Sequence, residues 1–94
     1  MWQYEIIRSE SKGGLIVGLT FEEKRFLLGL NITYYRRAKK ITQAELAERV
    51  NVTSNYLSQI ERGLKTVSLP ILMDIADHLG ITEMDLFDFR KHQK

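Results

Sequence analysis

The sequence has no cysteine, a single proline and no long hydrophobic run. Without cysteine there is neither a disulfide to hold the fold nor a thiolate to act as a nucleophile or metal ligand. No apolar stretch approaches the roughly 20 residues that a membrane-spanning helix needs. The opening residues, MWQYEIIRSE, lack the basic start and apolar run of a signal peptide. We therefore expect a cytoplasmic protein that has no membrane partner.

Catalytic and metal-binding patterns are equally sparse. The chain has 94 residues, which suits one small domain and leaves no room for a separate catalytic domain. Its two histidines, His78 and His92, have no partners at metal-ligand spacing, and no glycine-rich phosphate loop precedes a helix. We expect no enzyme activity, no metal, no cofactor and no small-molecule ligand, with both histidines at the surface.

One short pattern occurs three times, as ITQAEL (41–46), VTSNYL (52–57) and ITEMDL (81–86). In each copy a threonine follows a β-branched apolar residue and precedes a leucine by four positions, which is typical of a capped helix start. Thr20 with Glu23, and Ser68 before Leu69-Pro70, supply two further starts. The sequence thus predicts an all-α fold with helices over about 22–39, 43–50, 54–62, 69–79 and 83–89. Gly29 lies inside the first of these, so ordered helix is expected to begin near it.

The two faces of the predicted helix over 54–62 differ in kind. Leu57, Ile60 and Leu64 have the spacing of a buried stripe. The opposite face carries small hydroxyls and carboxamides with one arginine: Ser54, Asn55, Ser58, Gln59 and Arg62. Only residues 51–53 separate this helix from the one before, and Asn51 tolerates a left-handed corner. Two helices joined so tightly must cross steeply, which is the geometry of a helix-turn-helix unit with its second helix displayed outward.

Positive charge is concentrated around this unit. Residues 36–65 hold seven basic and three acidic side chains, a net charge of +4, whereas residues 1–35 are neutral and residues 66–94 carry −2. A local basic field attracts polyanions even when the whole chain, at +2, is nearly neutral.

From about Leu28 to Phe87 the chain resembles the phage-repressor-like (Xre-type) helix-turn-helix regulators. The resemblance rests on LGLNITYYRRAKKITQAELAERVNVTSNYLSQIERG followed by LPILMDIADHLGI, with Asn51 at a corner that is often glycine. It implies a five-helix lambda-repressor-like DNA-binding domain over residues 21–90. An N-terminal extension would precede it at residues 1–20, and a charged tail would follow at 91–94.

The resemblance also implies that the helix from Ser54 to Arg62 lies in the major groove of double-stranded DNA. The candidate base contacts are Asn55 and Gln59, then Ser54, then Ser58; carboxamides can pair with adenine through two hydrogen bonds. By similarity to the family, the candidate phosphate contacts flank this helix, at Thr42, Gln43, Arg62, Lys65 and Thr66. Tyr56 is expected to pack inward and to reach a phosphate with its hydroxyl. An ion pair between Arg36 and Glu61 would join the first helix to the third.

The first twenty residues lie outside the resemblance. Apolar residues alternate at Trp2, Tyr4 and Ile6 and again at Leu15, Val17 and Leu19, around turn residues 11–14, which predicts a β-hairpin. The hairpin would either cap its own helical core or pair with a second chain. The other candidate dimer interface is at the last helices, near Met84, Phe87 and Phe89, and the sequence leaves both open.

Two functions remain. The first is a sequence-specific transcriptional regulator, a repressor that binds a pseudo-palindromic operator as a homodimer, because one short helix reads few bases. The alternative is a protein–protein adaptor that keeps the fold without reading DNA.

Overall fold

The computed structural model describes residues 18–92 of the chain. The β-hairpin predicted for residues 1–20 lies outside this part, apart from its last three residues. Leu19 is buried against Leu27, and Thr20 caps the helix that follows.

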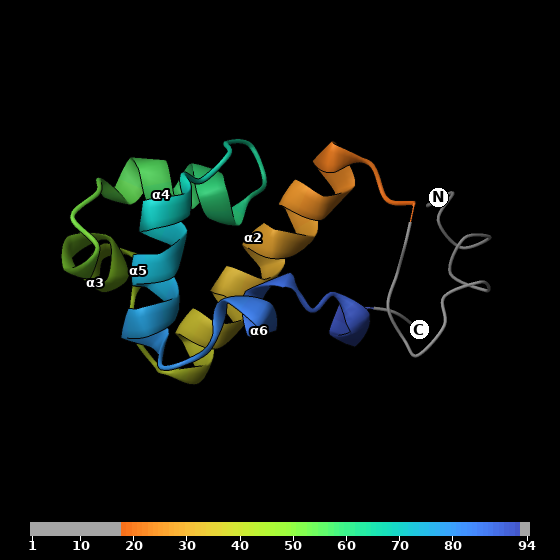
Figure 1. Ribbon diagram of the computed structural model, residues 1–94. Coiled ribbons are helices and arrows are strands. Elements are labelled where there is room, and N and C mark those ends of the chain that lie inside the picture. The colour runs from red at the N-terminus through yellow and green to blue at the C-terminus, as the bar shows by residue number, and fades with distance from the viewer. Residues whose placement is uncertain (1–17, 93–94) are drawn as a thin grey trace.

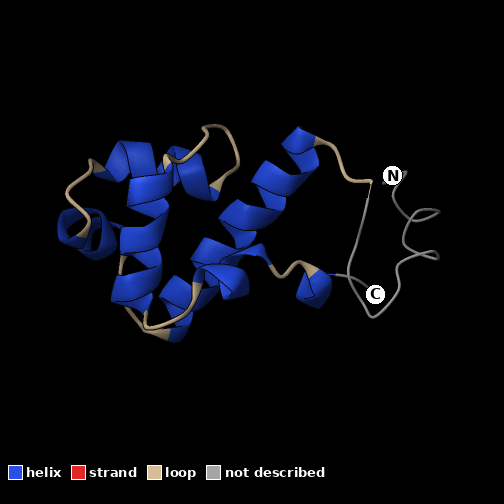
Figure 2. Ribbon diagram, in the orientation of Figure 1, coloured by secondary structure: helices blue, strands red, loops and turns tan. Residues whose placement is uncertain are grey.

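Every regular element of the described residues is a helix (Figures 1 and 2). The elements are α2 (Phe21–Ala38), α3 (Gln43–Arg49), α4 (Ser54–Glu61), α5 (Leu69–Leu79), α6 (Glu83–Phe87) and the 3₁₀ helix η2 (Arg90–His92). The five α-helices agree with the predicted ranges to within two residues at each end. Within residues 18–92, no helix combines the length and the apolar character that crossing a bilayer requires.

Threonine caps begin four of these helices. The hydroxyl oxygens of Thr20, Thr42, Thr53 and Thr82 each accept a hydrogen bond from a backbone N–H of the first turn, and all but Thr53 form complete capping boxes. These bonds satisfy backbone donors that would otherwise have no partner. Ser68 has the backbone conformation of a cap at α5 but makes no side-chain capping bond there.

The expectation that ordered helix begins near Gly29 is wrong, because α2 already begins at Phe21. Gly29 instead lies where the backbones of α2 and α4 come close together. A Cβ atom at Gly29 would lie 2.5 Å from the carbonyl oxygen of Glu61 and 2.6 Å from that of Ile60. Glycine is therefore used here for close packing of two backbones, and its low helix propensity is offset by that contact.

The corner between α3 and α4 has the left-handed residue that the sequence predicts. Asn51 has φ 62°, and its neighbour Val52 donates a backbone hydrogen bond to the carbonyl oxygen of Ala47. In Figure 1 the two helices meet at this corner, and α5 contacts α3. The geometry holds α4 at the edge of the domain with one face outward.

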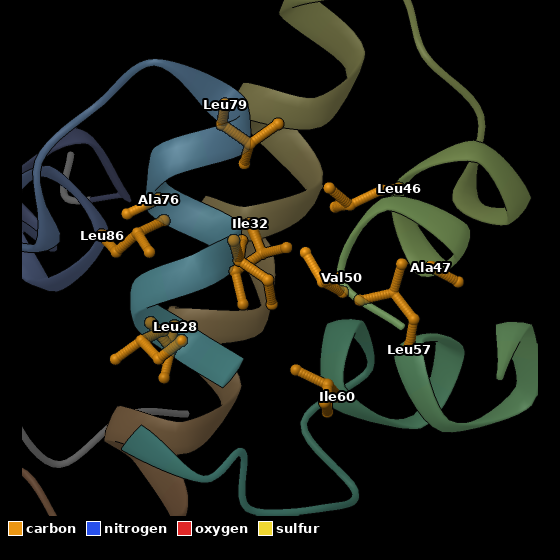
Figure 3. Packing of buried hydrophobic residues seen from close by; sticks show 12 residues of the cluster. Leu28, Ile32, Leu46, Ala47, Val50, Leu57, Ile60, Ala76, Leu79 and Leu86 are labelled. Atoms are coloured by element: carbon orange, nitrogen blue, oxygen red, sulfur yellow. The ribbon is translucent and has the colours of Figure 1, made fainter. Parts of the chain in front are cut away.

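The core lies between α2, α5 and the α3–α4 pair (Figure 3). Its fully covered side chains come from every α-helix: Ile32, Leu46, Leu57, Ile60, Ile75, Leu79 and Leu86. The predicted stripe of α4 is correct for Leu57 and Ile60 but wrong for Leu64, whose surface is 59% exposed. The helix ends at Glu61, so the helical spacing no longer applies three residues later.

The interpretation of both histidines as surface residues holds for His78 and is wrong for His92. The Nε2 atom of His92 lies 2.7 Å from Oδ1 of Asn31, and its side chain is half-buried. Asn31 is fully buried in α2, and its amide nitrogen donates to the carbonyl oxygens of Leu86 and Asp88. One carboxamide therefore anchors the end of the described chain to α2.

Candidate nucleic-acid interface

The outward face of α4 is polar along its length. Ser54 and Asn55 are exposed, while Ser58 and Gln59 are half-buried. Leu57 occupies the inward face and is fully buried. The structure therefore brings the four predicted base-contact residues together on one accessible helix face.

Three side chains hold the last residue of α4, Glu61, by hydrogen bonds. Glu61 is buried, and its Oε2 accepts from Nε of Arg36 at 2.7 Å. Its Oε1 accepts from Nη2 of Arg36 at 3.0 Å, from Nε2 of Gln43 at 2.9 Å and from the hydroxyl of Thr33 at 3.0 Å. The predicted ion pair is present, and because it is buried, the small free energy typical of exposed pairs does not apply to it.

This cluster joins α4 to both preceding helices, α2 and α3. Arg36 also donates from Nη1 to the carbonyl oxygen of Ile41, in the turn that leads into α3. A buried carboxylate surrounded by four donors has one favourable geometry, because each donor lost would leave a desolvated charge. The orientation of α4 relative to α2 and α3 is therefore set by Glu61.

The loop that leaves α4 is also fastened to α2. Nε of Arg25 donates to the carbonyl oxygen of Gly63 at 2.9 Å, and Gly63 has φ +75°, which favours glycine. Beyond this bond, Lys65 and Thr66 are exposed, as is Arg62 at the C-cap. Three of the predicted phosphate contacts thus lie accessible on one loop at the end of α4.

The remaining phosphate candidates are more constrained. The hydroxyl of Thr42 accepts from the backbone N–H of Glu45, and the amide nitrogen of Gln43 donates to Glu61. Tyr56 is half-buried and packs against the core. Any phosphate contact at α3 therefore falls to the backbone N–H groups of its first turn or to the side-chain oxygens, whose orientation these bonds already fix.

The capping box of Thr42 and Glu45 also determines the charge at the start of α3. The backbone N–H of Thr42 donates to the Glu45 carboxylate, and this bond is the main reason why the pKa of Glu45 is lowered from 4.5. The carboxylate contributes negative charge beside the helix start, so the basic residues around α4 and its loop carry the local positive potential. Among residues 18–92 there is no group of three or more histidine and acidic side chains arranged to hold a metal ion.

Comparison with known proteins identifies the family. The HTH_3 helix-turn-helix family model matches residues 32–86, which contain the corner, the polar helix and the Glu61 cluster. The chain belongs to the Xre-type helix-turn-helix family. Members are non-enzymatic, DNA-binding transcriptional regulators, and this protein is one of them.

Three relatives illustrate the range of similarity. A Sinorhizobium fredii protein described as an uncharacterised HTH-type transcriptional regulator, y4dJ, is 34% identical over 64 residues, covering 68% of this chain and 83% of its own. The immunity repressor protein of Bacillus phage phi105 is 41% identical over 54 residues, which are 57% of this chain but only 38% of that protein. The crystal structure of the restriction-modification controller protein C.AhdI from Aeromonas hydrophila superposes with a TM-score of 0.67 at 29% identity, covering 69% of this chain and 98% of that one. The fold of this family member is thus the five-helix, lambda-repressor-like one.

Sequence reasoning overlooked two positioning residues. Thr33 and Arg25 look like ordinary polar positions of an amphipathic helix, yet they hold Glu61 and Gly63. Their partners are 28 and 38 residues away along the chain, so no local pattern could have identified them.

Proposed function

We propose that this protein is a sequence-specific repressor that binds a pseudo-palindromic operator as a dimer, with residues 21–90 as its DNA-binding domain. The observation that carries the proposal is the accessible carboxamide and hydroxyl face of α4, held in one orientation by the buried Glu61. Such groups match the hydrogen-bonding edges of bases in the major groove.

The residues have separate roles in this proposal. Asn55 and Gln59 make the main base contacts, and Ser54 and Ser58 make supporting ones. Arg62, Lys65 and Thr66 bind phosphates on one side of the groove. Thr42, Gln43 and the Tyr56 hydroxyl bind phosphates on the other, and contacts of this kind position the protein without reading sequence.

Similarity to a known repressor supports repression, and the short length of α4 supports binding as a dimer. The similarity to a phage immunity repressor favours repression by occupation of a promoter. A single helix of eight residues reads too few bases for useful specificity, whereas two copies would read half-sites about 34 Å apart.

Selection of fragments from random duplex DNA, followed by a salt titration of the enriched site, tests the proposal. We expect an inverted repeat, and an affinity that falls by about 0.9 log unit per log unit of salt for each phosphate neutralised. A protein that enriches no sequence and shows no salt-dependent duplex affinity would instead fit the adaptor function.

A further inference from the structure

We propose that the N-terminal half of α2 holds the turn after α4 (residues 62–66) in the conformation that binds DNA phosphates, and that Arg25 is the positioning residue. The part of α2 before residue 32 lies outside the stretch that the family model matches. The proposal rests on the proposed function for the role of this turn at DNA. The contact between α2 and the turn is a property of the protein without DNA.

The turn closes the end of α4 with its own backbone. The N–H of Gly63 donates to the carbonyl oxygen of Ile60 at 3.0 Å, and the N–H of Leu64 donates to that of Gln59 at 2.8 Å. Gly63 has φ +75°, so the two bonds form the common helix ending in which a left-handed glycine follows the last turn. These bonds use the N–H groups of Gly63 and Leu64, whereas the carbonyl oxygen of Gly63 takes its partner from another helix.

Arg25 of α2 is that partner. Its Nε donates to the Gly63 oxygen at 2.9 Å. A hydrogen bond from a charged donor is stronger than one between neutral groups. The guanidinium of Arg25 also lies over the ring of Phe21, with 5.3 Å between Cζ and the ring centroid. This cation–π contact favours one position of the side chain, so the donor stays directed at the turn.

The backbones of α2 and the turn also come close together. A Cβ atom on Gly63 would lie 2.8 Å from the Cα atom of Phe26, the residue after Arg25. Because Cα is a main-chain atom, no change of side-chain rotamer could relieve such a contact. Two consecutive residues of α2 therefore hold the turn, one by a hydrogen bond and the other by backbone packing.

The three candidate phosphate contacts of this turn lie on either side of Gly63. Arg62 comes immediately before it, and Lys65 and Thr66 follow two and three residues later. All three are exposed, and their side chains make no hydrogen bond or ion pair with the residues that the structure describes. Their positions therefore depend on the backbone of the turn, and an ordered turn has less conformational entropy to lose on binding. Because phosphate contacts carry no sequence information, we expect Arg25 to affect binding to all duplexes alike.

Lys24 provides a matched control for Arg25. It is the preceding residue of α2, carries the same charge and lines the same hollow between α2, α5 and α6. Its side chain is exposed and makes no hydrogen bond or ion pair within residues 18–92. Arg25→Met and Lys24→Met each remove one positive charge and keep a linear side chain, so a difference between them reports the bond to Gly63.

The first test measures backbone order parameters by NMR relaxation in the protein without DNA. We expect the values of residues 63–66 to fall in Arg25→Met from about 0.85, typical of rigid backbone, toward about 0.6, typical of flexible backbone. Lys24→Met should keep the wild-type values in the turn, and α5 should stay rigid in both variants. An unchanged turn in Arg25→Met, or an equal loss of order in α5, overturns the proposal.

The second test measures duplex affinity in a double-mutant cycle of Arg25→Met and Lys65→Ala. We expect Arg25→Met alone to weaken binding to the selected operator and to a scrambled duplex by the same factor, about tenfold, as for one lost hydrogen bond from a charged group. In the Lys65→Ala protein this loss should be about threefold smaller, because part of the contact that Arg25 positions is already gone. Additive losses, an unchanged affinity, or an equal loss in Lys24→Met would each overturn the proposal.

Failure of this proposal is distinguishable from failure of the proposed function. A protein whose turn loses order in Arg25→Met but which binds no duplex would keep the role of Arg25 in the turn and remove the proposed function. A protein that binds its operator with the same affinity and the same turn dynamics in Arg25→Met would do the reverse.

Discussion

The backbone of Gly29 in α2 lies against the backbone of Glu61 at the end of α4, and a Cβ atom would come within 2.5 Å of the Glu61 carbonyl oxygen. At this contact α2 touches α4, the helix proposed to read DNA. The carboxylate of Glu61 accepts hydrogen bonds from Thr33 and Arg36, which lie further along α2, and from Gln43 of α3. Backbone packing and buried charge together set the position of α4.

We expect Gly29→Ala to lower the free energy of unfolding by about 1–3 kcal/mol, the range for overpacking in a well-packed interior. Helix propensity alone predicts a gain of about 1 kcal/mol, so the sign separates the two explanations. Urea denaturation measures it. Arg37→Ala, at an exposed position of the same helix, serves as the control and should change stability by less than about 0.5 kcal/mol. A stabilised Gly29→Ala protein would contradict the close approach.

We expect Glu61→Gln to cost about 3–5 kcal/mol, because it leaves the buried Arg36 guanidinium without its counter-charge. Glu48→Gln is the matched control, since Glu48 is exposed on α3. Urea denaturation of both variants makes the comparison. A loss of less than 1 kcal/mol in Glu61→Gln would mean that the pair does not hold α4 in place.

The double variant Asn55→Ala with Gln59→Ala should lose preference for the selected operator while keeping weak binding to any duplex. Each good two-pronged base contact is worth roughly 1–3 kcal/mol of discrimination. The measurement is the ratio of affinities for the selected site and for a scrambled one. Asp77→Ala, an exposed polar position on α5, should leave the ratio unchanged. An unchanged ratio in the double variant would show that another surface reads the bases.

Lys65→Ala should weaken binding to all duplexes alike and reduce the salt slope by about one unit, as expected for one lost phosphate contact. Lys39→Ala is the control, because the Lys39 ammonium lies near Gly80 at the end of α5. Affinity titrations at several salt concentrations supply both slopes. A loss confined to the selected site would assign Lys65 to base reading instead.

The sequence alone was enough to predict the five helices and the left-handed corner at Asn51. Caps, corners and apolar stripes are local: a threonine, its partner three residues on and a leucine four residues on are all visible in one short stretch. The same local reasoning placed the polar face of α4 outward. It fails at Leu64, because α4 already ends at Glu61, and at Gly29, because the low helix propensity of glycine does not delay the start of α2 at Phe21.

Only the tertiary structure decided which groups hold α4 in place and which surfaces remain uncovered. Thr33 and Arg36 of α2 and Gln43 of α3 meet at Glu61 of α4, and His92 contacts Asn31 from 61 residues away. Likewise, the hollow lined by Leu28 of α2, Leu72 of α5 and Phe87 of α6 exists because these helices leave space between them. Such relationships depend on how helices pack in space, since distance along the chain carries no information about which side chains share a buried charge.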